Sequence, residues 1–501
     1  MTSLQVLDFS VFKSSVTMPP NLLRSLCSLE VLNLELSLAS GNMTQFLESL
    51  QQNCSSHKKI RQLNLADNFI NGTLPTGMSL FINLVTLQLQ NNKITGLLPL
   101  EVSMLTNLTV MELGSNNLHG AITEEHFSGL HNLRMIDLSY NQLEVAVDHE
   151  WLPPFIRLQE AYLASCHMGP QFPSWMQHLP DIDKIDILST GIADQLPYWF
   201  STAFSKVTYL DISNNSISGG LPANMEIMSL KRLRLGSNQL TGPIPRLPIN
   251  LTLLDLSHNS LSGPLPSNFG APSLRWVHLS SNNFSRHIPG SICGLQELII
   301  LDLANNRLQG EFPQCPGTIS QFSFLNRLSE MTALILANNS LSGTFPSFLQ
   351  GCTQLWLLDL SGNKFTGRLP IWIGDLMELR YLRLSNNLFY GNIPFSITNL
   401  GKLYDLNLAG NGLSGAIPCH LSNLMAMAGN GKNDDSGDQD WYFDGSLSLL
   451  PVTTKDQELY YGLLAFSSMV SIDLSSNYLT GGIPEEITYL KLLKNLNLSR
   501  N

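Results

Sequence analysis

The residues of this chain that could do chemistry are its carboxylates, histidines and cysteines, and they form no catalytic pattern. Glu124 with Glu125 and Glu485 with Glu486 are adjacent pairs, so in a loop they are solvated charges rather than a general acid and base. Four aspartates suggest calcium but lack the EF-hand spacing and its closing Glu, so a polar loop explains them better; they are Asp434, Asp435, Asp438 and Asp440. The motifs H-E-x-x-H, C-x-x-C, G-x-S-x-G and G-x-x-x-x-G-K-S/T are missing. We therefore predict no enzyme, no metal site and no cofactor.

Composition excludes further classes of function. The 501 residues carry a net charge of -11, which disfavours a nucleic-acid partner because phosphate contacts require a basic surface. The sequence contains no run of 18 apolar residues that could span a bilayer. Residues 1–16 lack the apolar core of a signal peptide. We expect any secretion signal and membrane segment to be encoded outside this sequence.

A fixed-period repeat predicts the fold that must position any site. The frame L-x-x-L-x-L-x-x-N ends at Asn68, Asn92, Asn116, Asn141, Asn215, Asn238, Asn259, Asn282, Asn306, Asn339, Asn363, Asn387, Asn411, Asn477 and Asn501. Cys166 and Thr190 fall in the same phase, and two weaker copies begin at Leu4 and Leu29, which gives 19 units. In L-x-L the side-chain period of two sends both leucines inward, so each unit supplies one short strand. We predict an α/β repeat solenoid, a right-handed superhelix with a parallel sheet on its concave face and the asparagines buried in a ladder.

A second signature, L-x-G-x-I-P, follows the ladder position. Its glycines are Gly72, Gly96, Gly120, Gly219, Gly242, Gly263, Gly310, Gly343, Gly367, Gly391, Gly415 and Gly481. Gly opens backbone conformations closed to other residues and Pro fixes φ, so we predict turns on the outer side. This signature resembles the plant-specific class of leucine-rich repeats. The resemblance implies an extracellular protein, of the kind found in receptor kinases, receptor-like proteins and polygalacturonase inhibitors.

Cysteines and glycosylation motifs fit a secretory route. The N-x-S/T motifs lie at Asn42, Asn53, Asn71, Asn107, Asn214, Asn250, Asn283, Asn338 and Asn497. Cys293 and Cys315 lie almost one repeat apart, so adjacent coils bring them together as a candidate disulfide. Cys166 is interpreted as a ladder substitute, and Cys54 and Cys352 as buried thiols.

One insertion interrupts the period, because the step from Asn411 to Asn477 is 66 residues. We divide the chain into repeats at residues 1–427, an island at 428–466 and resumed repeats at 467–501. The passage 449–477 resembles the island and following repeat of plant receptor-like proteins, the group that includes receptors for fungal xylanase. The segment L-S-S-N-Y-L-T-G-G-I-P-E-E-I at residues 474–487 also resembles that group. Lys455, Tyr460 and Tyr461 are the island's candidate contact residues.

The resemblance implies a single-pass plasma-membrane protein with an extracellular solenoid and no kinase of its own, truncated here at both ends. Its ligand would be a protein or peptide of microbial or endogenous origin. Signalling, in immunity or development, would pass through co-receptor leucine-rich-repeat receptor kinases. The alternative is a secreted inhibitor of cell-wall-degrading enzymes, which shares the repeat but looks shorter and lacks an island.

Outward strand positions on the concave face supply the candidate ligand contacts. Most are ordinary, and Asp recurs between the two leucines, as at Asp137 and Asp359. The exceptions are residue types enriched at binding hot spots, namely Tyr162, Tyr209, Arg232, Arg234, Trp276 and His278, with a second group at Tyr381 and Arg383. The first group spans five strand steps, about 24 Å. The same strand phase predicts that Leu382 is buried and that Tyr381 points outward. Tyr381→Ala should therefore scarcely affect stability.

Overall fold

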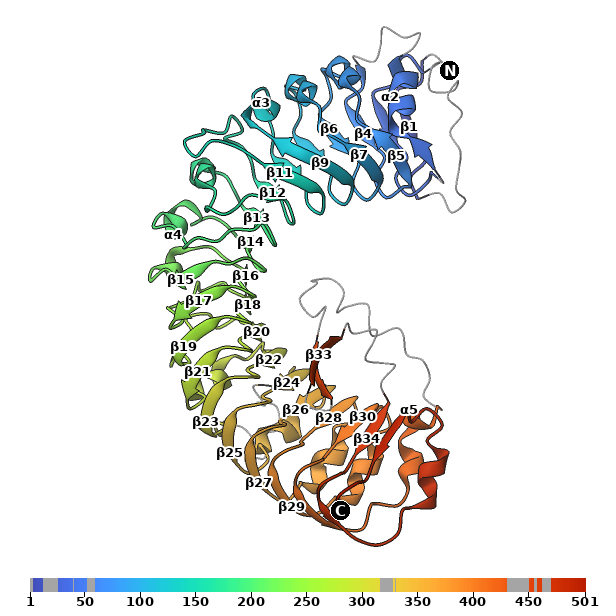
Figure 1. Ribbon diagram of the computed structural model, residues 1–501, viewed down its shortest axis with the longest axis vertical. Coiled ribbons are helices and arrows are strands. Elements are labelled where there is room, and N and C mark those ends of the chain that lie inside the picture. Colours follow the sequence, from blue (N-terminus) through green and yellow to red (C-terminus); the bar gives the residue numbers. More distant parts are fainter. Residues whose placement is uncertain are drawn as a thin grey trace. The chain divides into compact units, whose positions relative to one another are not determined.

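The chain folds into two compact units built from the predicted repeats. The computed structural model describes residues 3–11, 26–38, 40–51, 59–315, 328, 330–429, 450–454, 457–461 and 470–501. The units are Met1–Asn259 and Ser260–Asn501, hereafter unit 1 and unit 2 (Figure 1). Each unit is a solenoid of stacked coils whose short strands form a parallel main sheet.

Each repeat contributes one strand to the main sheet. In unit 1 these are β1 (Val6–Asp8), β2 (Val31–Asn33), β4 (Gln62–Asn64), β6 (Thr86–Gln88), β8 (Val110–Glu112), β10 (Met135–Asp137), β12 (Glu160–Tyr162), β13 (Lys184–Asp186), β14 (Tyr209–Asp211), β16 (Arg232–Arg234) and β18 (Leu253–Asp255). In unit 2 they are β20 (Trp276–His278), β22 (Ile300–Asp302), β24 (Ala333–Ile335), β26 (Leu357–Asp359), β28 (Tyr381–Arg383), β30 (Asp405–Asn407), β34 (Ser471–Asp473) and β36 (Asn495–Asn497). Pairing is parallel and in register, as in Leu358 opposite Leu382.

The leucines of the frame form the core of each unit. The side chains of Leu87, Leu89, Leu382 and Leu384 are all fully buried. Adjacent coils supply the same residue type at the same height, so each coil buries its apolar face against its neighbours. The predicted strand phase is therefore correct at Leu382.

The ladder asparagines satisfy backbone groups of two successive coils. Asn92 donates from Nδ2 to the carbonyls of Leu65, Leu89 and Gln90 at 2.9, 3.1 and 3.2 Å, and its Oδ1 accepts from the Ile70 N–H at 2.9 Å. Most of the predicted ladder is buried, but Asn215, Asn259 and Asn339 are half-buried and Asn501 is exposed.

Cys166 and Thr190 occupy the predicted ladder position but make fewer hydrogen bonds there than asparagine does. Cys166 Sγ lies 3.3 Å from the Leu138 carbonyl, and burial raises its pKa to about 12. Thr190 donates its hydroxyl to the Ile187 carbonyl at 3.0 Å.

The glycine signature forms strands as well as turns, which the sequence analysis did not predict. These strands pair in parallel into smaller second sheets. In unit 1 they are β3 (Gly41–Asn42), β5 (Ile70–Thr73), β7 (Lys93–Gly96), β9 (Asn117–Ile122), β11 (Gln142–Val145), β15 (Ser218–Gly220) and β17 (Gln239–Gly242). In unit 2 they are β19 (Ser260–Pro264), β21 (Asn283–Arg286), β23 (Arg307–Glu311), β25 (Ser340–Gly343), β27 (Lys364–Gly367), β29 (Leu388–Asn392), β31 (Gly412–Gly415) and β35 (Tyr478–Leu479). The left-handed conformation still requires glycine, as at Gly343 with φ +92°, where an added Cβ would lie 2.7 Å from Glu311 Cγ.

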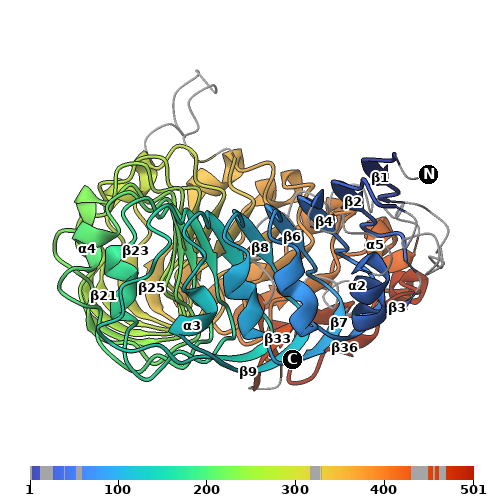
Figure 2. The same cartoon turned by 90° about the horizontal axis from the view of Figure 1, so that it is seen from above.

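Short helices complete the coils on the side away from the main sheet. Most of those described are 3-10 turns, namely η2 (Thr76–Leu80), η3 (Leu100–Met104), η4 (Ser174–His178), η5 (Met225–Ile227), η6 (Gly290–Gly294), η8 (Ser347–Gly351), η9 (Ile371–Asp375), η10 (Phe395–Asn399), η11 (Leu421–Asn423) and η13 (Glu485–Tyr489). All of these except η5 and η11, which follow Asn224 and His420, start directly after a proline, which has no N–H to lose there. The α-helices are α2 (Met43–Gln51), α3 (Glu124–Phe127), α4 (Phe200–Ala203) and α5 (Met425–Ala428). In Figure 2, α2 and α3 lie along the same edge of unit 1.

The island contains an antiparallel hairpin within unit 2. Strands β32 (Leu450–Thr454) and β33 (Gln457–Tyr461) pair from Leu450 opposite Tyr461 to Thr454 opposite Gln457. Lys455 lies outside the described residues, as do the four aspartates first considered for calcium.

Two cysteines of unit 2 join neighbouring coils. A disulfide links Cys293 and Cys315, the predicted pair, whose Cα atoms are 5.2 Å apart. Cys352 is a buried free thiol, and Cys54 lies outside the described residues.

Candidate functional site

The outward face of the main sheet is the side that carries the first and third residues of each three-residue strand. The Asp that recurs at the third position has a local structural role. Asp137, Asp211 and Asp359 each accept, through Oδ1, the backbone N–H two residues later at 2.9–3.0 Å. These aspartates therefore end their strands, which explains the recurrence without a ligand.

In unit 1 predicted tyrosines and arginines take part in two polar clusters on this face. Arg234 donates from Nη1 to the Tyr209 hydroxyl at 3.1 Å and lies 3.6 Å from Asp211 Oδ2. The Tyr162 hydroxyl donates to Glu160 at 2.9 Å. All these side chains except that of Asp211 are half-buried. Tyr209 and Arg234 thus stand on adjacent strands and are held in place before any ligand arrives.

Lys184 adds to the pair of Tyr162 and Glu160, and Arg232 lies beside Tyr209 on the neighbouring strand. Arg232 is half-buried and is the register partner of Tyr209. Lys184, which the sequence analysis did not select, lies 3.1 Å from Glu160 Oε1. Its position before the first inner residue of its strand could have indicated its outward orientation.

Burial and like charges shape the electrostatics of the unit 1 face. Burial, with Asp211 nearby, raises the pKa of Asp186 to about 7. Burial also raises the pKa of Tyr162 and of Tyr209, so both phenols stay neutral. The face therefore offers neutral aromatic hydroxyls beside partly desolvated carboxylates, a combination suited to polar and cationic groups of a protein or peptide.

In unit 2 the predicted contact residues are less accessible than expected. Tyr381 is only 5% exposed and belongs to an apolar cluster with Ile335 and Leu357, so the interpretation of Tyr381 as a free outward residue is wrong. The period of two assigned its side of the sheet correctly, but that side is covered. His278 is also buried, and Trp276 is half-buried beneath Arg275, whose guanidinium lies 4.9 Å from the ring centroid.

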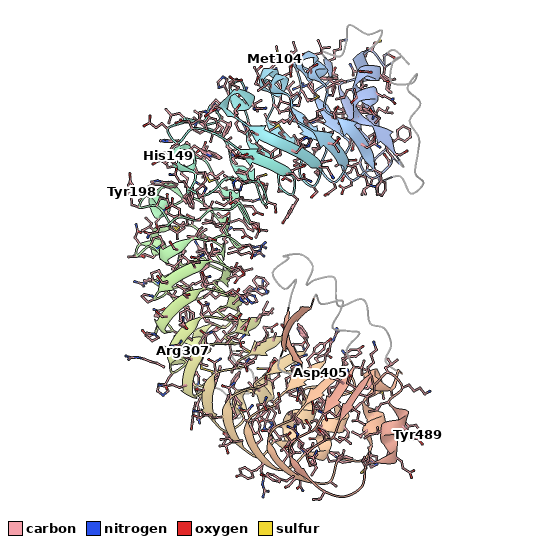
Figure 3. The ribbon with its side chains drawn as sticks, in the orientation of Figure 1. Met104, His149, Tyr198, Arg307, Asp405 and Tyr489 are labelled. Carbon is pink, nitrogen blue, oxygen red and sulfur yellow. A yellow bond between two sulfur atoms is a disulfide. The ribbon has the colours of Figure 1, made fainter. Side chains whose placement is uncertain are left out.

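Arg383 is a buried ion-pair residue rather than an exposed contact. Its Nε donates to Asp405 Oδ2 at 2.6 Å, and its Nη1 lies 4.0 Å from Asp359 Oδ2. Burial opposes the charge of Arg383, but the two carboxylates outweigh it and raise its pKa. Figure 3 labels Asp405 on the main-sheet side of unit 2.

A polar cleft of about 200 Å³ opens beside Arg383. Its lining includes Asn338, Asp359, Ser361, Arg383, Asn386 and Asp473. The sequence does not predict this cleft, because the cleft depends on which side chains of five successive coils leave space between them. Carboxylates and carboxamides predominate there, so the cleft suits hydrogen-bond donors of a ligand.

The predicted glycosylation positions are mostly accessible. Exposed side chains occur at Asn71, Asn107, Asn214, Asn250, Asn338 and Asn497. Asn42 and Asn283 are half-buried, and Asn53 lies outside the described residues. Asn338 also lines the cleft, so a glycan there would compete with a ligand for it.

The repeats match known family models. Leucine rich repeat models match residues 82–143, 249–308 and 329–389, and further single repeats match at 206–226, 402–424 and 468–490. The described residues contain no helix long and apolar enough to cross a membrane. The chain belongs to the leucine-rich-repeat proteins.

Its relatives define the group within that family. The chain is 36% identical over 216 residues to Receptor-like protein EIX2 of Solanum lycopersicum, which is 41% of this chain and 18% of the relative. Receptor-like protein EIX1 of the same species is 39% identical over 133 residues, 26% of this chain and 13% of that protein. This similarity places the chain among the plant leucine-rich-repeat receptor-like proteins. The matched segments span less than a fifth of these relatives.

The fold is also that of plant receptor ectodomains. The Arabidopsis receptor kinase HAESA, solved in complex with the peptide hormone IDA and the co-receptor SERK1, matches with a TM-score of 0.77 and 26% identity. That match covers 100% of this chain and 75% of the HAESA chain. The family to which the chain is similar is a ligand-binding, non-catalytic kind of protein.

Proposed function

We propose that this chain is the ligand-binding ectodomain of a plant cell-surface receptor-like protein that signals through co-receptor receptor kinases. The observation that carries the proposal is the group of half-buried side chains Tyr162, Tyr209, Arg232 and Arg234 on the outward face of unit 1, in which Arg234 donates to the Tyr209 hydroxyl. Half-buried aromatic and arginine side chains that are already oriented lose little conformational entropy when a partner binds. The ligand would be a protein or peptide.

Similarity to the EIX receptor-like proteins supports a receptor role at the extracellular face of the plasma membrane. The resemblance of the island to that of xylanase receptors supports a microbial protein as the ligand. The HAESA complex supports the alternative that the ligand is a peptide hormone and that the co-receptor resembles SERK1. Either version differs from a secreted inhibitor of cell-wall-degrading enzymes in needing a co-receptor.

The test measures binding of the secreted chain to three immobilised probes: a fungal xylanase, the IDA peptide and a SERK1 ectodomain. We expect the xylanase or the peptide to bind, and to promote SERK1 binding. Arg232→Glu and Tyr209→Ala should weaken ligand binding by at least about tenfold each, as hot-spot residues do. Arg307→Glu is the matched control, because Arg307 is exposed and points away from the coil (Figure 3).

If Arg232→Glu and Tyr209→Ala both bind the ligand as well as the parent chain does, the outward face of unit 1 is not the ligand-binding surface. Xylanase binding and inhibition without any recruitment of SERK1 would instead favour the secreted inhibitor.

A further inference from the structure

The polar cleft of unit 2 lies where two successive coils depart from the pattern of the outward face. In other coils the third strand residue is often Asp, and the Ser two residues later donates to it, as Ser361 does to Asp359 at 2.5 Å. The coil of β28 carries Arg383 in place of that Asp. The coil of β30 carries Asn407 and Ala409 in place of the Asp and the Ser. Residues of both altered coils line the cleft.

The exchange of Asp for Arg383 leaves Ser385 without its usual acceptor. The side chain of Ser385 is only 8% exposed, and its hydroxyl has no hydrogen-bond partner within the part of the chain that the structure describes. Arg383 cannot take the place of the Asp, because a guanidinium carries only donors. Ser385 lines the cleft. Since buried polar groups are nearly always hydrogen-bonded, this hydroxyl needs a partner from the cleft, either water or a ligand.

Asn407 lacks its usual acceptor for the same reason. At the same strand position three other asparagines donate from Nδ2 to a carboxylate of the preceding coil at 3.0–3.2 Å, namely Asn33, Asn64 and Asn497. The register partner of Asn407 in the preceding coil is Arg383. Asn407 Oδ1 accepts the Ala409 N–H at 3.1 Å, whereas its Nδ2 has no partner among the described residues. The middle of the cleft therefore offers two donors, Ser385 and Asn407.

The flanks of the cleft offer acceptors, and its charges are balanced. Asp359 and Asp473 line the cleft from the coils on either side of β28 and β30. Arg383 is neutralised by Asp405 at 2.6 Å and by Asp359 at 4.0 Å. A ligand anion would meet the flanking carboxylates, and a ligand cation would meet Arg383. Ala409 is the largest apolar residue of the described lining, so the cleft suits a neutral group that both accepts and donates hydrogen bonds.

Saccharide hydroxyls have this combined character, since each hydroxyl donates one hydrogen bond and accepts others. Neighbouring hydroxyls of one sugar can meet the central donors and a flanking carboxylate together, which a single peptide amide cannot. The volume of about 200 Å³ equals the share of about seven water molecules in the liquid, enough to admit one sugar ring. Asn338 lies in the lining and begins an N-x-S motif, so a saccharide could also reach the cleft from this chain's own glycan.

We propose that the cleft around Ser385 and Asn407 binds a neutral saccharide. Its hydroxyl oxygens accept from these two donors, and its hydroxyl hydrogens are donated to Asp359 and Asp473. The saccharide comes either from another molecule or from the glycan on Asn338. The site belongs to unit 2 and shares no residue with the face proposed for the protein or peptide ligand in unit 1. Its failure would therefore leave the proposed function standing.

Saturation-transfer NMR titration with neutral tetrasaccharides of glucose, xylose and N-acetylglucosamine tests the site, with the tetrasaccharide of galacturonic acid as the anionic counterpart. The secreted chain is compared with its Ser340→Ala variant, which removes the glycosylation motif but leaves the cleft lining unchanged. We expect a neutral tetrasaccharide to bind Ser340→Ala at least about tenfold more tightly than the anionic one, because the anion meets like charges. Equal binding by the parent chain indicates that the saccharide comes from another molecule. Binding confined to Ser340→Ala indicates that the glycan on Asn338 fills the cleft.

Variants in the Ser340→Ala background test which groups bind the saccharide. The double variant Asn407→Asp, Ala409→Ser recreates the Asp-x-Ser pattern of other coils, so it should keep the fold. It should weaken saccharide binding by at least about tenfold, as should Ser385→Ala, because each removes a donor from the cleft. Ser257→Ala is the matched control, since Ser257 holds the same strand position in unit 1, where it donates to Asp255 at 2.6 Å. It should bind the saccharide as well as its background does.

The proposal is wrong if no neutral tetrasaccharide binds the Ser340→Ala chain, or if the double variant binds as tightly as its background. A peptide ligand that loses affinity in the double variant, without any saccharide binding, would assign the cleft to peptide amides instead.

Discussion

Replacing Asn387 by Ala should destabilise unit 2 strongly, although it removes only a small polar side chain. Asn387 is 5% exposed. Its Nδ2 donates to the carbonyls of Leu360, Leu384 and Ser385 at 2.9, 3.1 and 3.2 Å, and its Oδ1 accepts from the Phe365 N–H at 3.0 Å. Alanine leaves the Phe365 N–H and at least one buried carbonyl without partners.

Each stranded buried group costs about 1–3 kcal/mol, so Asn387→Ala should lower the free energy of unfolding by about 2–5 kcal/mol. Asn387→Thr should cost less, because Thr190 already serves in this phase by donating to a carbonyl of its own coil. Asn387→Asp should cost at least as much as alanine, since it keeps the acceptor but loses both donors and buries a charge.

Urea denaturation followed by circular dichroism measures these differences, and amide hydrogen exchange at Phe365 gives a local readout. Asn399→Ala is the control, because Asn399 is exposed at the end of η10, and its effect should stay within about 0.5 kcal/mol. The ladder argument fails if the Asn387 and Asn399 variants unfold at the same urea concentration, or if the Phe365 amide keeps its protection in Asn387→Ala.

Three further predictions concern charge and burial. The pKa of Asp186 is about 7 in folded unit 1 against 3.8 in the unfolded chain, so between these values the folded state binds the extra proton. The free energy of unfolding of unit 1 should therefore fall as pH rises from about 4 to 7. Asp186→Asn should make the urea midpoint of unit 1 less dependent on pH over that range. Arg383→Ala should cost about 3–5 kcal/mol by leaving two buried carboxylates unpaired, whereas Lys402→Ala, which breaks an exposed pair, should cost under about 1 kcal/mol by the same assay. Tyr381→Ala should cost about 3–5 kcal/mol as a buried aromatic truncation and Tyr162→Ala much less; equal losses would contradict the burial difference.

The sequence predicted the repeat fold because its signals are local and periodic. Inner leucines such as Leu382, the ladder asparagines and the conformation of Gly343 each follow from spacing within one coil. The second sheets escaped prediction because glycine and proline normally mark turns, and here hydrogen bonding between adjacent coils overrides that preference. Whether these segments form strands is therefore decided by hydrogen bonds to the neighbouring coils rather than by their own residue types.

The sequence predicted on which side of the main sheet the candidate contact residues lie, but not how exposed their side chains are. Period-two alternation places Tyr162 and Tyr381 on the same side of the main sheet, and the structure agrees. Exposure is a separate property, because it depends on what lies above the sheet. Tyr162 remains half-buried within a polar network, whereas Tyr381 is buried in an apolar cluster. The chemical character of the neighbouring outward residues gave the available signal, since Ile335 and Leu357 at such positions indicate a covered face. A ligand of this chain should therefore be sought on the outward face of unit 1, where charged and tyrosine side chains are half-buried.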